Sequence, residues 1–176
     1  MSSLFDHHIP GLDFLENKLI RDHRGYLGEI VPWGITNDFL EWKLGHIYAS
    51  VATGKHIARG GHYHHKNIDR FCTLSGSALW VFIDYRTEDH TVFSMILGEK
   101  EYKNDFWIKN YTIDLGYMIT ASVPIGVYHI FIPLTDERVT VLSLASEIHD
   151  DDDYVRIKPH DIPEIQSLLH NFDIQW

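Results

Sequence analysis

The stretch that decides the fold is "ARGGHYHHKNIDRFCTLSG", Ala58 to Gly76, which places three histidines within four residues after an Arg-Gly pair. Side chains alternate along an extended chain, so His62 and His64 share one face. Tyr63 and His65 then face the opposite side. Two imidazoles on one face, two residues apart, can hold one metal ion or contact one substrate. The stretch therefore predicts a functional site on an extended segment.

Two further segments complete the group of side chains. Asp69 follows His64 by five residues, and "PIGVYH" places His129 at a strand–turn–strand junction. Imidazole and carboxylate groups are ligands for a divalent transition metal of the zinc or iron type. The predicted metal ligands are His62, His64, Asp69 and His129.

The rest of the chain is read mainly as short strands. Eight segments are rich in Val, Ile, Tyr, Phe, Trp and Thr and are bounded by turn-forming or charged residues. They span residues 25–33, 46–52, 70–85 with a break at 75–77, 90–97, 106–113, 116–124, 128–134 and 138–148. Many short strands at this spacing predict an all-β sandwich or barrel.

One helix is predicted near the C-terminus, over about residues 161–171. Asp161 can cap it, Pro163 lies in its first turn, and Ile165 begins an apolar stripe. With no repeat and no linker in the sequence, we assign residues 1–176 to a single domain.

Composition limits the classes of function. The chain has 176 residues, 44% of them hydrophobic and 13% aromatic, which is typical of a folded domain. A formal charge of −10 argues against nucleic acid or an anionic membrane as the main partner. The single cysteine, Cys72, and the lack of a signal peptide or a membrane-length apolar run predict a cytoplasmic protein. The run Asp150–Asp153 is interpreted as a solvated acidic turn.

The spacing of the site residues resembles the two motifs of the cupin superfamily. In this chain the motifs are His62-x-His64-x4-Asp69-x6-Gly76 and Pro124-x-Gly126-x2-His129. Asp69 stands where the family usually has Glu. The resemblance covers about Arg59–His129 and implies a jelly-roll barrel, to which the predicted C-terminal helix is added.

Four strings resemble those of dTDP-4-dehydrorhamnose 3,5-epimerases, namely "RDHRGYLGEI", "RGGHYH", "FIDYR" and "VPIGVYHIF". The resemblance implies a homodimer that acts on a dTDP- or UDP-linked 4-keto-6-deoxysugar, without an organic cofactor. It also implies that Arg24, Glu29 and Arg59 lie near the nucleotide or its phosphates. In the same family, the position of His62 is that of the catalytic base.

Two departures point to other relatives. Thirteen residues beyond His129, where those epimerases have a catalytic tyrosine, this chain has Leu142, and their late Trp-Asn-Asp-Pro segment is absent. "HYHHKNIDRF" resembles the cupin domain of capsular-polysaccharide reductase/epimerases, which has a zinc-type site and epimerises C3. "LASEIHDDDDYVR" resembles a string of dTDP-4-keto-6-deoxyglucose 3,4-ketoisomerases, in which two alternate histidines shuttle protons. C3 epimerisation and 3,4-ketoisomerisation therefore both stay open.

In either reaction we expect His62 to be the base, because imidazole can remove the acidic hydrogen beside a keto group near neutral pH. His64 or a metal-bound water is the expected second proton donor, and Asp69 the expected orienting carboxylate. Further substrate contacts are expected from the side chains of Tyr63, Lys66, Tyr128 and His129. Barrel packing ranks ahead of substrate contact for the two tyrosines, and a solvated turn ranks ahead of it for the lysine.

Two other classes of function stay open beside the isomerase. The ligand set also suits a metal-dependent cupin oxidoreductase acting on a small molecule. A non-catalytic module that binds a nucleotide sugar is the third interpretation. The isomerase ranks first because the sugar-epimerase strings flank the histidines, and it implies a role in polysaccharide or deoxysugar biosynthesis.

Overall fold

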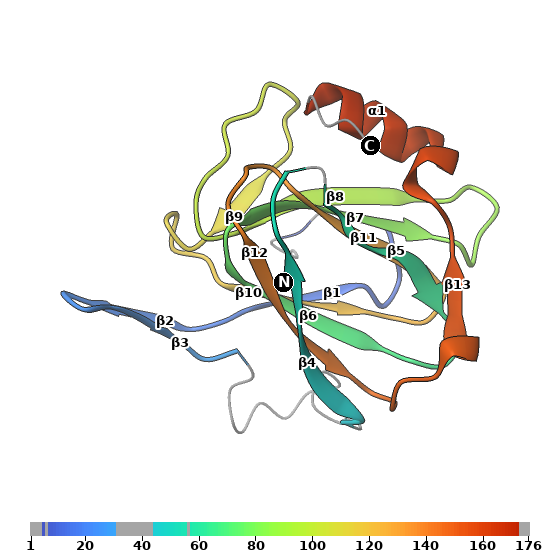
Figure 1. The fold of residues 1–176 in the computed structure, drawn as a ribbon, viewed down its shortest axis with the longest axis horizontal. Coiled ribbons are helices and arrows are strands. Elements are labelled where there is room, and N and C mark those ends of the chain that lie inside the picture. The colour runs from blue at the N-terminus through green and yellow to red at the C-terminus, as the bar shows by residue number, and fades with distance from the viewer. Residues whose placement is uncertain (1–4, 6, 31–43, 56, 173–176) are drawn as a thin grey trace.

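The computed structural model describes residues 5, 7–30, 44–55 and 57–172, which form a β barrel made of two facing sheets (Figure 1). The five-stranded sheet has the order β1 (Asp13–Glu16), β10 (Ile119–Val123), β6 (Asp69–Ser75), β12 (Val139–Ala145) and β4 (His46–Ala52). The six-stranded sheet has the order β13 (Tyr154–Arg156), β5 (Arg59–His64), β11 (Val127–Pro133), β7 (Ser77–Asp84), β8 (Val92–Gly98) and β9 (Asn110–Thr112). Among the described strands, the β8–β9 pair is parallel and the other pairs are antiparallel.

Three further elements lie outside these sheets. Strands β2 (Leu19–Asp22) and β3 (Gly25–Gly28) form a hairpin that projects from the barrel (Figure 1). The helix α1 (Pro163–Asn171) lies across the outer face of the six-stranded sheet (Figure 1). Short 3-10 turns cover Asp151–Asp153 and Pro159–Asp161.

The barrel interior is filled from both sheets by alternate side chains. Phe71 of β6 contacts Trp80 of β7, with ring centroids 5.1 Å apart, and Trp80 also packs on Phe131 of β11. These residues belong to one buried cluster that joins the two sheets. Because strand side chains alternate, each strand can face the interior with one set and present the other outward. The predicted all-β jelly-roll class is confirmed.

Strand β7 is buried along its whole length, because both of its faces are covered. Its outward side chains, such as Leu79 and Val81, pack with Ile165 and Leu169 of α1 in a second buried cluster. A strand covered on both sides becomes a nearly continuous apolar run. The string "SALWVFID" is therefore apolar on both faces because α1 covers the outward side of β7.

The start of α1 corrects one prediction. The helix begins at Pro163, and the residue that precedes it is Ile162, with no side-chain cap. Asp161 instead ends the preceding 3-10 turn, where its exposed carboxylate lies 3.5 Å from His160. The predicted cap was wrong because Asp161 belongs to the 3-10 turn that precedes the helix, so Ile162 occupies the capping position. The prediction that Pro163 lies in the first turn is confirmed.

The predicted strands correspond to the observed strands with differences at their ends. The segment 46–52 is confirmed as β4, and the break at 75–77 is confirmed at Gly76, which has φ +67°. A Cβ there would lie 2.5 Å from the Arg138 carbonyl oxygen, so glycine is required by both conformation and space. The segment 106–113 is a strand only over β9, and β1, β2 and β13 were not predicted. Residues 31–33 of the first predicted strand lie outside the described part, and the single-domain assignment stays a prediction.

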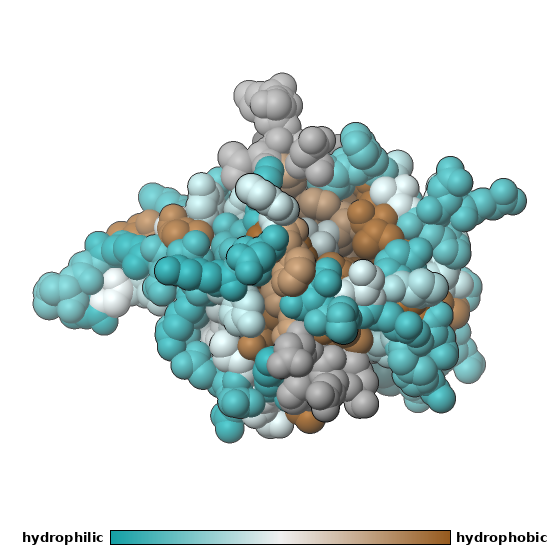
Figure 2. Space-filling view, turned by 90° about the horizontal axis from the view of Figure 1, so that it is seen from above, coloured by the Kyte–Doolittle hydropathy of each residue, from teal (hydrophilic) through white to brown (hydrophobic). Residues whose placement is uncertain are grey.

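One face of the molecule shows how hydrophilic and hydrophobic side chains are distributed (Figure 2). Seen from above, hydrophilic side chains surround a hydrophobic strip that crosses the middle of the molecule (Figure 2). The one described α-helix has nine residues, and no helix in the described residues is long and apolar enough to cross a membrane.

Candidate active site

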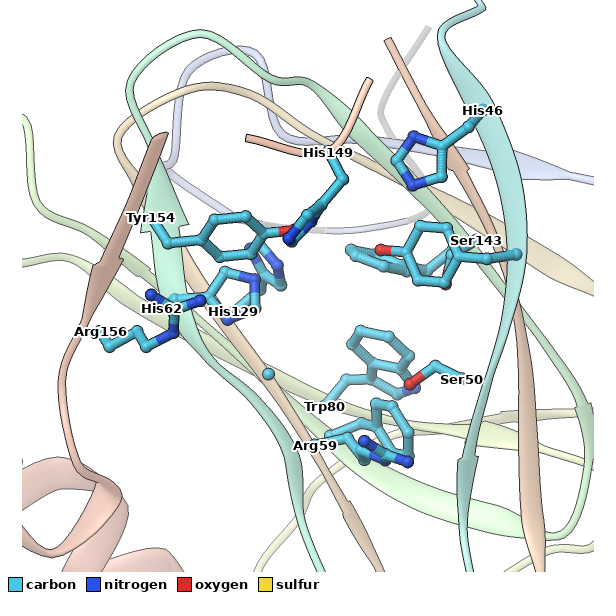
Figure 3. Close-up of a pocket in the computed structure, with 14 residues that line it drawn as sticks. His46, Ser50, Arg59, His62, Trp80, His129, Ser143, His149, Tyr154 and Arg156 are labelled. Carbon is cyan, nitrogen blue, oxygen red and sulfur yellow. The ribbon is translucent and has the colours of Figure 1, made fainter. Parts of the chain in front are cut away.

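A cavity of about 420 Å³ opens between the two sheets (Figure 3). This volume is within the range of small-molecule sites. The side chains and backbone that line it come from both sheets and from the segment before β13; they are His46, Tyr48, Ser50, Arg59, Gly60, His62, Phe71, Trp80, His129, Phe131, Ser143, His149, Tyr154 and Arg156. An apolar floor with polar groups at the sides can bind a ligand that has both kinds of surface.

The histidines of β5 and β11 meet inside the barrel, as predicted. His62 is paired with His129 in the strand register, and their ring centroids lie 4.7 Å apart. His64 follows on the same face, with its ring centroid 4.9 Å from that of His62. Tyr63 and His65 face the other side of the strand, where their rings contact each other. The alternation argument therefore placed these side chains correctly.

Beneath the cavity lies a buried group of His64, Asp69 and His129, all 3% exposed or less. Asp69 Oδ2 lies 3.1 Å from His64 Nε2 and 3.7 Å from His129 Nε2. None of these three atoms has a hydrogen bond with suitable geometry. A buried polar atom without a partner is costly, so the group fits a bound cation better than an empty space.

His62 lies close to this buried group. One ligand atom from each of the four predicted residues lies within 4.8 Å of the others. His62 is the least buried of the four and faces the cavity, whereas His64 and Asp69 do not line it. The predicted ligand set is therefore brought together, with His62 on the substrate side.

The acidic run before β13 is not simply a solvated turn. Asp153 is 3% exposed, and its Oδ2 accepts a hydrogen bond from His64 Nδ1 at 2.9 Å. The same carboxylate accepts backbone N–H groups of His65, Lys66 and Asn67 at 2.7–3.2 Å. Backbone N–H groups can only donate, so they hold Asp153 as an acceptor and make His64 Nδ1 the donor. His64 Nε2 then points toward the buried group and lies 3.1 Å from Asp69 Oδ2.

This geometry corrects two expectations about carboxylates. The carboxylate that orients a histidine by a hydrogen bond is Asp153, and Asp69 instead faces the ligand nitrogens. Burial by itself would raise the pKa of Asp69, but His64, His129 and the Asn67 amide outweigh it and leave that pKa below its usual range. Asp69 is thus an ionised carboxylate inside the barrel.

The imidazoles that face the cavity are neutral. Burial, together with the nearby His129 and His64, lowers the pKa of His62 to about 3. Burial also lowers the pKa of His129 to about 4, although Asp69 opposes the shift. A neutral imidazole has a free lone pair, so His62 is in the form that can accept a proton or bind a metal.

A bulge in β5 brings an arginine to the same wall. His129 pairs with His62, but the next residue, Ile130, pairs with Gly60, so β5 has one extra residue at Gly61. Such a bulge reverses the alternation on one side of it. Arg59 therefore lines the cavity although it is three residues from His62. Its Nε donates to the Val51 carbonyl oxygen at 2.9 Å, which directs the guanidinium.

The neighbouring strand β13 adds two side chains that the sequence analysis did not select. Tyr154 and Arg156 pair with His64 and His62, respectively, and both line the cavity. The Arg156 guanidinium lies over the Tyr154 ring, 4.7 Å from its centroid, and contacts Asp151 at 3.2 Å. The alternation within "DYVR" was visible in the sequence, but its pairing with β5 was not.

The opposite wall carries Tyr48 and Ser143. They pair in the register of β4 and β12, and Tyr48 stacks on His46 with ring centroids 4.9 Å apart. Burial, with a smaller effect from Asp69, raises the pKa of Tyr48. Tyr48 was not singled out from the sequence, because nothing local relates it to the histidines.

Three predicted substrate contacts lie away from the cavity. Tyr63 stacks on Tyr85 on the outer face of β5, with ring centroids 5.6 Å apart. Tyr128 is fully buried on the other side of β11 from His129, and its hydroxyl donates to the Ile157 carbonyl oxygen. Lys66 is 68% exposed beside Asp150. Because side chains alternate along β5 and β11, the two tyrosines face away from the cavity that their neighbouring histidines line. The lysine lies in the turn after β5 and is in solvent.

The two predicted nucleotide-binding residues of the N-terminal region also lie elsewhere. Arg24 is 78% exposed at the β2–β3 hairpin and is paired with Asp22. Glu29 is exposed just after β3, and its backbone N–H donates to the Lys18 carbonyl oxygen. Within one chain the structure does not bring either residue to the cavity, so their contact with a nucleotide stays a prediction.

The fold and the inward histidines define the chain as a cupin-type jelly-roll barrel. No family model matches the sequence, and no curated protein does. Solved structures, however, match it over most of its length. A dTDP sugar isomerase from Desulfovibrio desulfuricans is 17% identical with a TM-score of 0.69, over 89% of each chain.

Two epimerases are similar in structure to this chain to about the same degree. ChmJ, a 3'-monoepimerase from Streptomyces bikiniensis solved with dTDP, is 17% identical over 89% of this chain and 73% of its own, with a TM-score of 0.70. The RmlC epimerase of Mycobacterium tuberculosis is 21% identical over the same shares, with a TM-score of 0.68. At this level of identity the similarity establishes the fold.

Proposed function

We propose that the chain is an isomerase that acts on a nucleotide-linked 4-keto-6-deoxysugar. The observation that carries the proposal is His62, a neutral imidazole that faces a cavity of about 420 Å³ beside two arginines. The support from relatives is that several proteins with this fold are named as dTDP-sugar epimerases or isomerases. The reaction is C3 epimerisation or 3,4-ketoisomerisation.

The residues of the cavity suit the parts of such a substrate. A keto group at C4 acidifies the hydrogen on C3, so a positioned neutral imidazole can remove it, which contributes roughly 10²–10⁴-fold in rate. Arg59 and Arg156 can each hold a phosphate oxygen of the diphosphate by charge-assisted hydrogen bonds. Trp80 and Phe131 supply apolar surface for the sugar ring or the base.

The proposal includes a divalent metal at the buried group, and the unpaired buried atoms support it. His64, Asp69 and His129 would hold it, because these residues carry the buried ligand atoms without partners. A bound divalent ion supplies Lewis-acid stabilisation to an oxygen that becomes negatively charged. One imidazole nitrogen cannot both bind a metal and accept a proton. We therefore assign His62, which faces the cavity, to proton transfer rather than to the metal.

The proposal includes a homodimer in the cytoplasm. Strand β4 is at the edge of its sheet, and such an edge can be covered by a partner. The β2–β3 hairpin projects from the barrel (Figure 1), so Arg24 and Glu29 would serve the cavity of a second copy rather than their own. The biological setting that this substrate implies is polysaccharide or deoxysugar biosynthesis.

The test is hydrogen exchange at C3. The protein is incubated in D₂O with dTDP-4-keto-6-deoxyglucose or its UDP analogue, and NMR should show deuterium entering the sugar at C3, or at C4 once the carbonyl has moved to C3. His62→Gln should abolish this exchange. His65→Gln, an exposed histidine on the outer side of the strand, should not affect it. If the wild-type protein neither incorporates deuterium into either substrate nor converts it to a product, the proposal is wrong.

A metal-dependent oxidoreductase is the second candidate, and the unpaired buried atoms favour it. It predicts stoichiometric iron and oxygen uptake with a small-molecule substrate. A metal-stripped protein that still catalyses exchange at C3 would exclude it. The binding-module interpretation predicts dTDP binding that survives His62→Ala and no turnover.

A further inference from the structure

The two walls of the cavity carry different groups. His62 and Tyr154 belong to the six-stranded sheet, on the neighbouring strands β5 and β13. Tyr48 and Ser143 belong to the five-stranded sheet, on β4 and β12. Figure 3 shows Ser50 and Ser143 across the cavity from His62 and Tyr154. A substrate between the sheets would therefore meet His62 and Tyr154 from the same side.

Tyr154 lies directly against the histidines. Its ring centroid is 4.7 Å from that of His62 and 4.4 Å from that of His64. Its hydroxyl makes a 3.2 Å hydrogen bond with His149 Nδ1, and the two side chains meet inside the cavity (Figure 3). The ring is thus packed against the histidines, and its hydroxyl is held by His149 in the same cavity that His62 lines.

Tyr154 is also connected to solvent. His149 is 57% exposed, and its Nε2 lies 3.5 Å from Asp151 Oδ1, which is itself exposed. A proton that leaves the Tyr154 hydroxyl can therefore be replaced through an imidazole in contact with water. Tyr48, in contrast, lies between the stacked His46 ring and the fully buried Ser143.

The position of the second proton-transfer group decides the reaction. Inversion at C3 removes a proton from one face of the ring and delivers one to the other face, so base and acid must lie on opposite walls. A 3,4-keto shift moves a proton between adjacent carbons and another between their oxygens, and both transfers can occur from one side.

We propose that Tyr154 is the catalytic residue that transfers the oxygen-bound proton beside His62, so that the reaction is a 3,4-keto shift. This inference rests on the proposed function and chooses between its two reactions. His149 is a positioning residue that holds the Tyr154 hydroxyl.

The step balances without any external oxidant. His62 takes the proton from C3, the C–H electron pair forms the C3=C4 bond, and the C4 oxygen takes the Tyr154 proton, which gives an enediol. Tyr154 then regains a proton from the C3 hydroxyl as the C3 carbonyl forms. His62 returns its proton to C4. C3 is oxidised and C4 is reduced within one molecule.

The test follows the carbonyl position and C3 exchange together, with dTDP-4-keto-6-deoxyglucose in D₂O and, separately, its UDP analogue. Carbon-13 NMR of the wild-type product should show the carbonyl at C3. Tyr154→Phe keeps the ring but removes the hydroxyl, and kcat for the keto shift should fall about 100-fold or more with KM nearly unchanged. Deuterium exchange at C3 should persist in this variant, because His62 is intact. A merely structural role would not separate the two readouts.

Two further variants complete the design. His149→Gln should lower kcat less than Tyr154→Phe, because a side-chain amide can still bond to the hydroxyl. Tyr102→Phe, whose ring packs on Phe172 at the outer face, is the matched control and should behave as wild type.

Several results would overturn the inference. A wild-type product that keeps its C4 carbonyl but is inverted at C3 would do so, as would wild-type kinetics for Tyr154→Phe. A loss of turnover in Tyr48→Phe with Tyr154→Phe still active would move the donor to the opposite wall. These results leave the proposed function intact. Failure of the wild-type protein to exchange C3 or form any product would instead refute the proposed function itself.

Discussion

The carboxylate of Asp153 determines which nitrogen of His64 faces the buried group. Three backbone N–H groups and His64 Nδ1 donate to it, so both of its oxygens are occupied by donors. A carboxylate that holds the far nitrogen of a ligand histidine fixes both its tautomer and its ring orientation. The same bonds also tie the segment before β13 to the turn after β5.

We predict that Asp153→Asn weakens binding of a divalent metal. The new amide would direct an N–H group at donors, so His64 would lose its fixed tautomer, and metal affinity should fall about 10–100-fold. The measurement is titration calorimetry with Zn²⁺ alone on the purified, metal-stripped protein. Asp152→Asn, at an exposed position, is the control. Equal affinity in Asp153→Asn and wild type would contradict the role given to Asp153.

Two arginines on the histidine wall should bind phosphate. Arg59→Gln and Arg156→Gln should each weaken dTDP binding about 10-fold or more, because a hydrogen bond to a charged group contributes roughly 1.5–3 kcal/mol. The measurement is calorimetric titration with dTDP, repeated at higher salt, where the difference should shrink. Arg138→Gln, on an exposed loop, serves as the control. Unchanged affinity in both cavity variants would exclude this phosphate site.

At the scale of the element, strand β5 owes its shape to glycine. Gly60 has φ +97°, and a Cβ there would lie 2.6 Å from the His129 carbonyl oxygen. This close approach occurs at the bulge that turns Arg59 toward the cavity. The pair "GG" in "RGGHYH" is therefore required by the backbone and by the neighbouring strand.

We predict that Gly60→Ala destabilises the fold by more than Gly116→Ala. Both glycines have a φ near +95°, and each pays about 1–3 kcal/mol of backbone strain, but a Cβ at Gly116 meets open space. The difference between their free energies of unfolding, from urea denaturation, isolates the contact with the His129 carbonyl. Equal losses of unfolding free energy in the two variants would contradict the prediction, because they would show that β5 and β11 can shift to accept the added Cβ.

The string "FIDYR" acts at the end of β7. Asp84 is 2% exposed, and both of its oxygens accept bonds from the Arg86 guanidinium at 2.8 Å. Arg86 also donates to the Pro10 carbonyl oxygen, which attaches the N-terminal segment to the barrel. These contacts give the motif a structural role in this chain.

We expect Asp84→Asn to lower stability by about 1–3 kcal/mol at pH 7, because a buried charged hydrogen bond is lost. The Arg86 hydrogen bond, despite burial, holds the pKa of Asp84 below its usual value of 3.8. The contribution is therefore fully present above pH 3.8 and is lost as the pH falls through the lower, folded-state pKa. Urea titrations from pH 7 to pH 2 should show the wild type and the variant converging. Asp105→Asn, at an exposed site, should show no such convergence.

At the scale of the whole molecule, the buried group joins the two sheets. Asp69 belongs to the five-stranded sheet, and His64 and His129 belong to the six-stranded sheet. A ligand bound by all three would therefore connect the two walls. Binding to the folded state alone raises stability with ligand concentration.

We predict that Zn²⁺ raises the Tm of the metal-stripped protein. At 100-fold its Kd the gain is about 2.7 kcal/mol, which corresponds to roughly 5–10 °C for a chain of this size. Scanning calorimetry with and without Zn²⁺, and again after EDTA, measures the effect. Asp69→Asn should show little or no rise. A wild-type protein insensitive to Zn²⁺ and to Fe²⁺ would count against the metal site.

Local patterns in the sequence were enough for several features. The period of two placed His62 and His64 on one face, and the short β-rich segments predicted the two-sheet barrel. The apolar stripe from Ile165 predicted α1. The same reasoning failed for the acidic run, because burial of an aspartate depends on neighbouring strands. Arg59 was expected near the phosphates from the resemblance, and it lines the cavity because of a bulge that local alternation does not predict.

The sequence by itself predicted the fold class and placed His62 and His64 on one face, since alternation and turn residues act within a few positions of the chain. Only the tertiary structure decided that Asp153 bonds to His64 and that Tyr154 lies beside His62 while Tyr48 lies across the cavity. Strand order and register are set by packing between segments up to 109 residues apart, as for Asp13 and Ser122, and that pairing leaves no periodic trace in either segment.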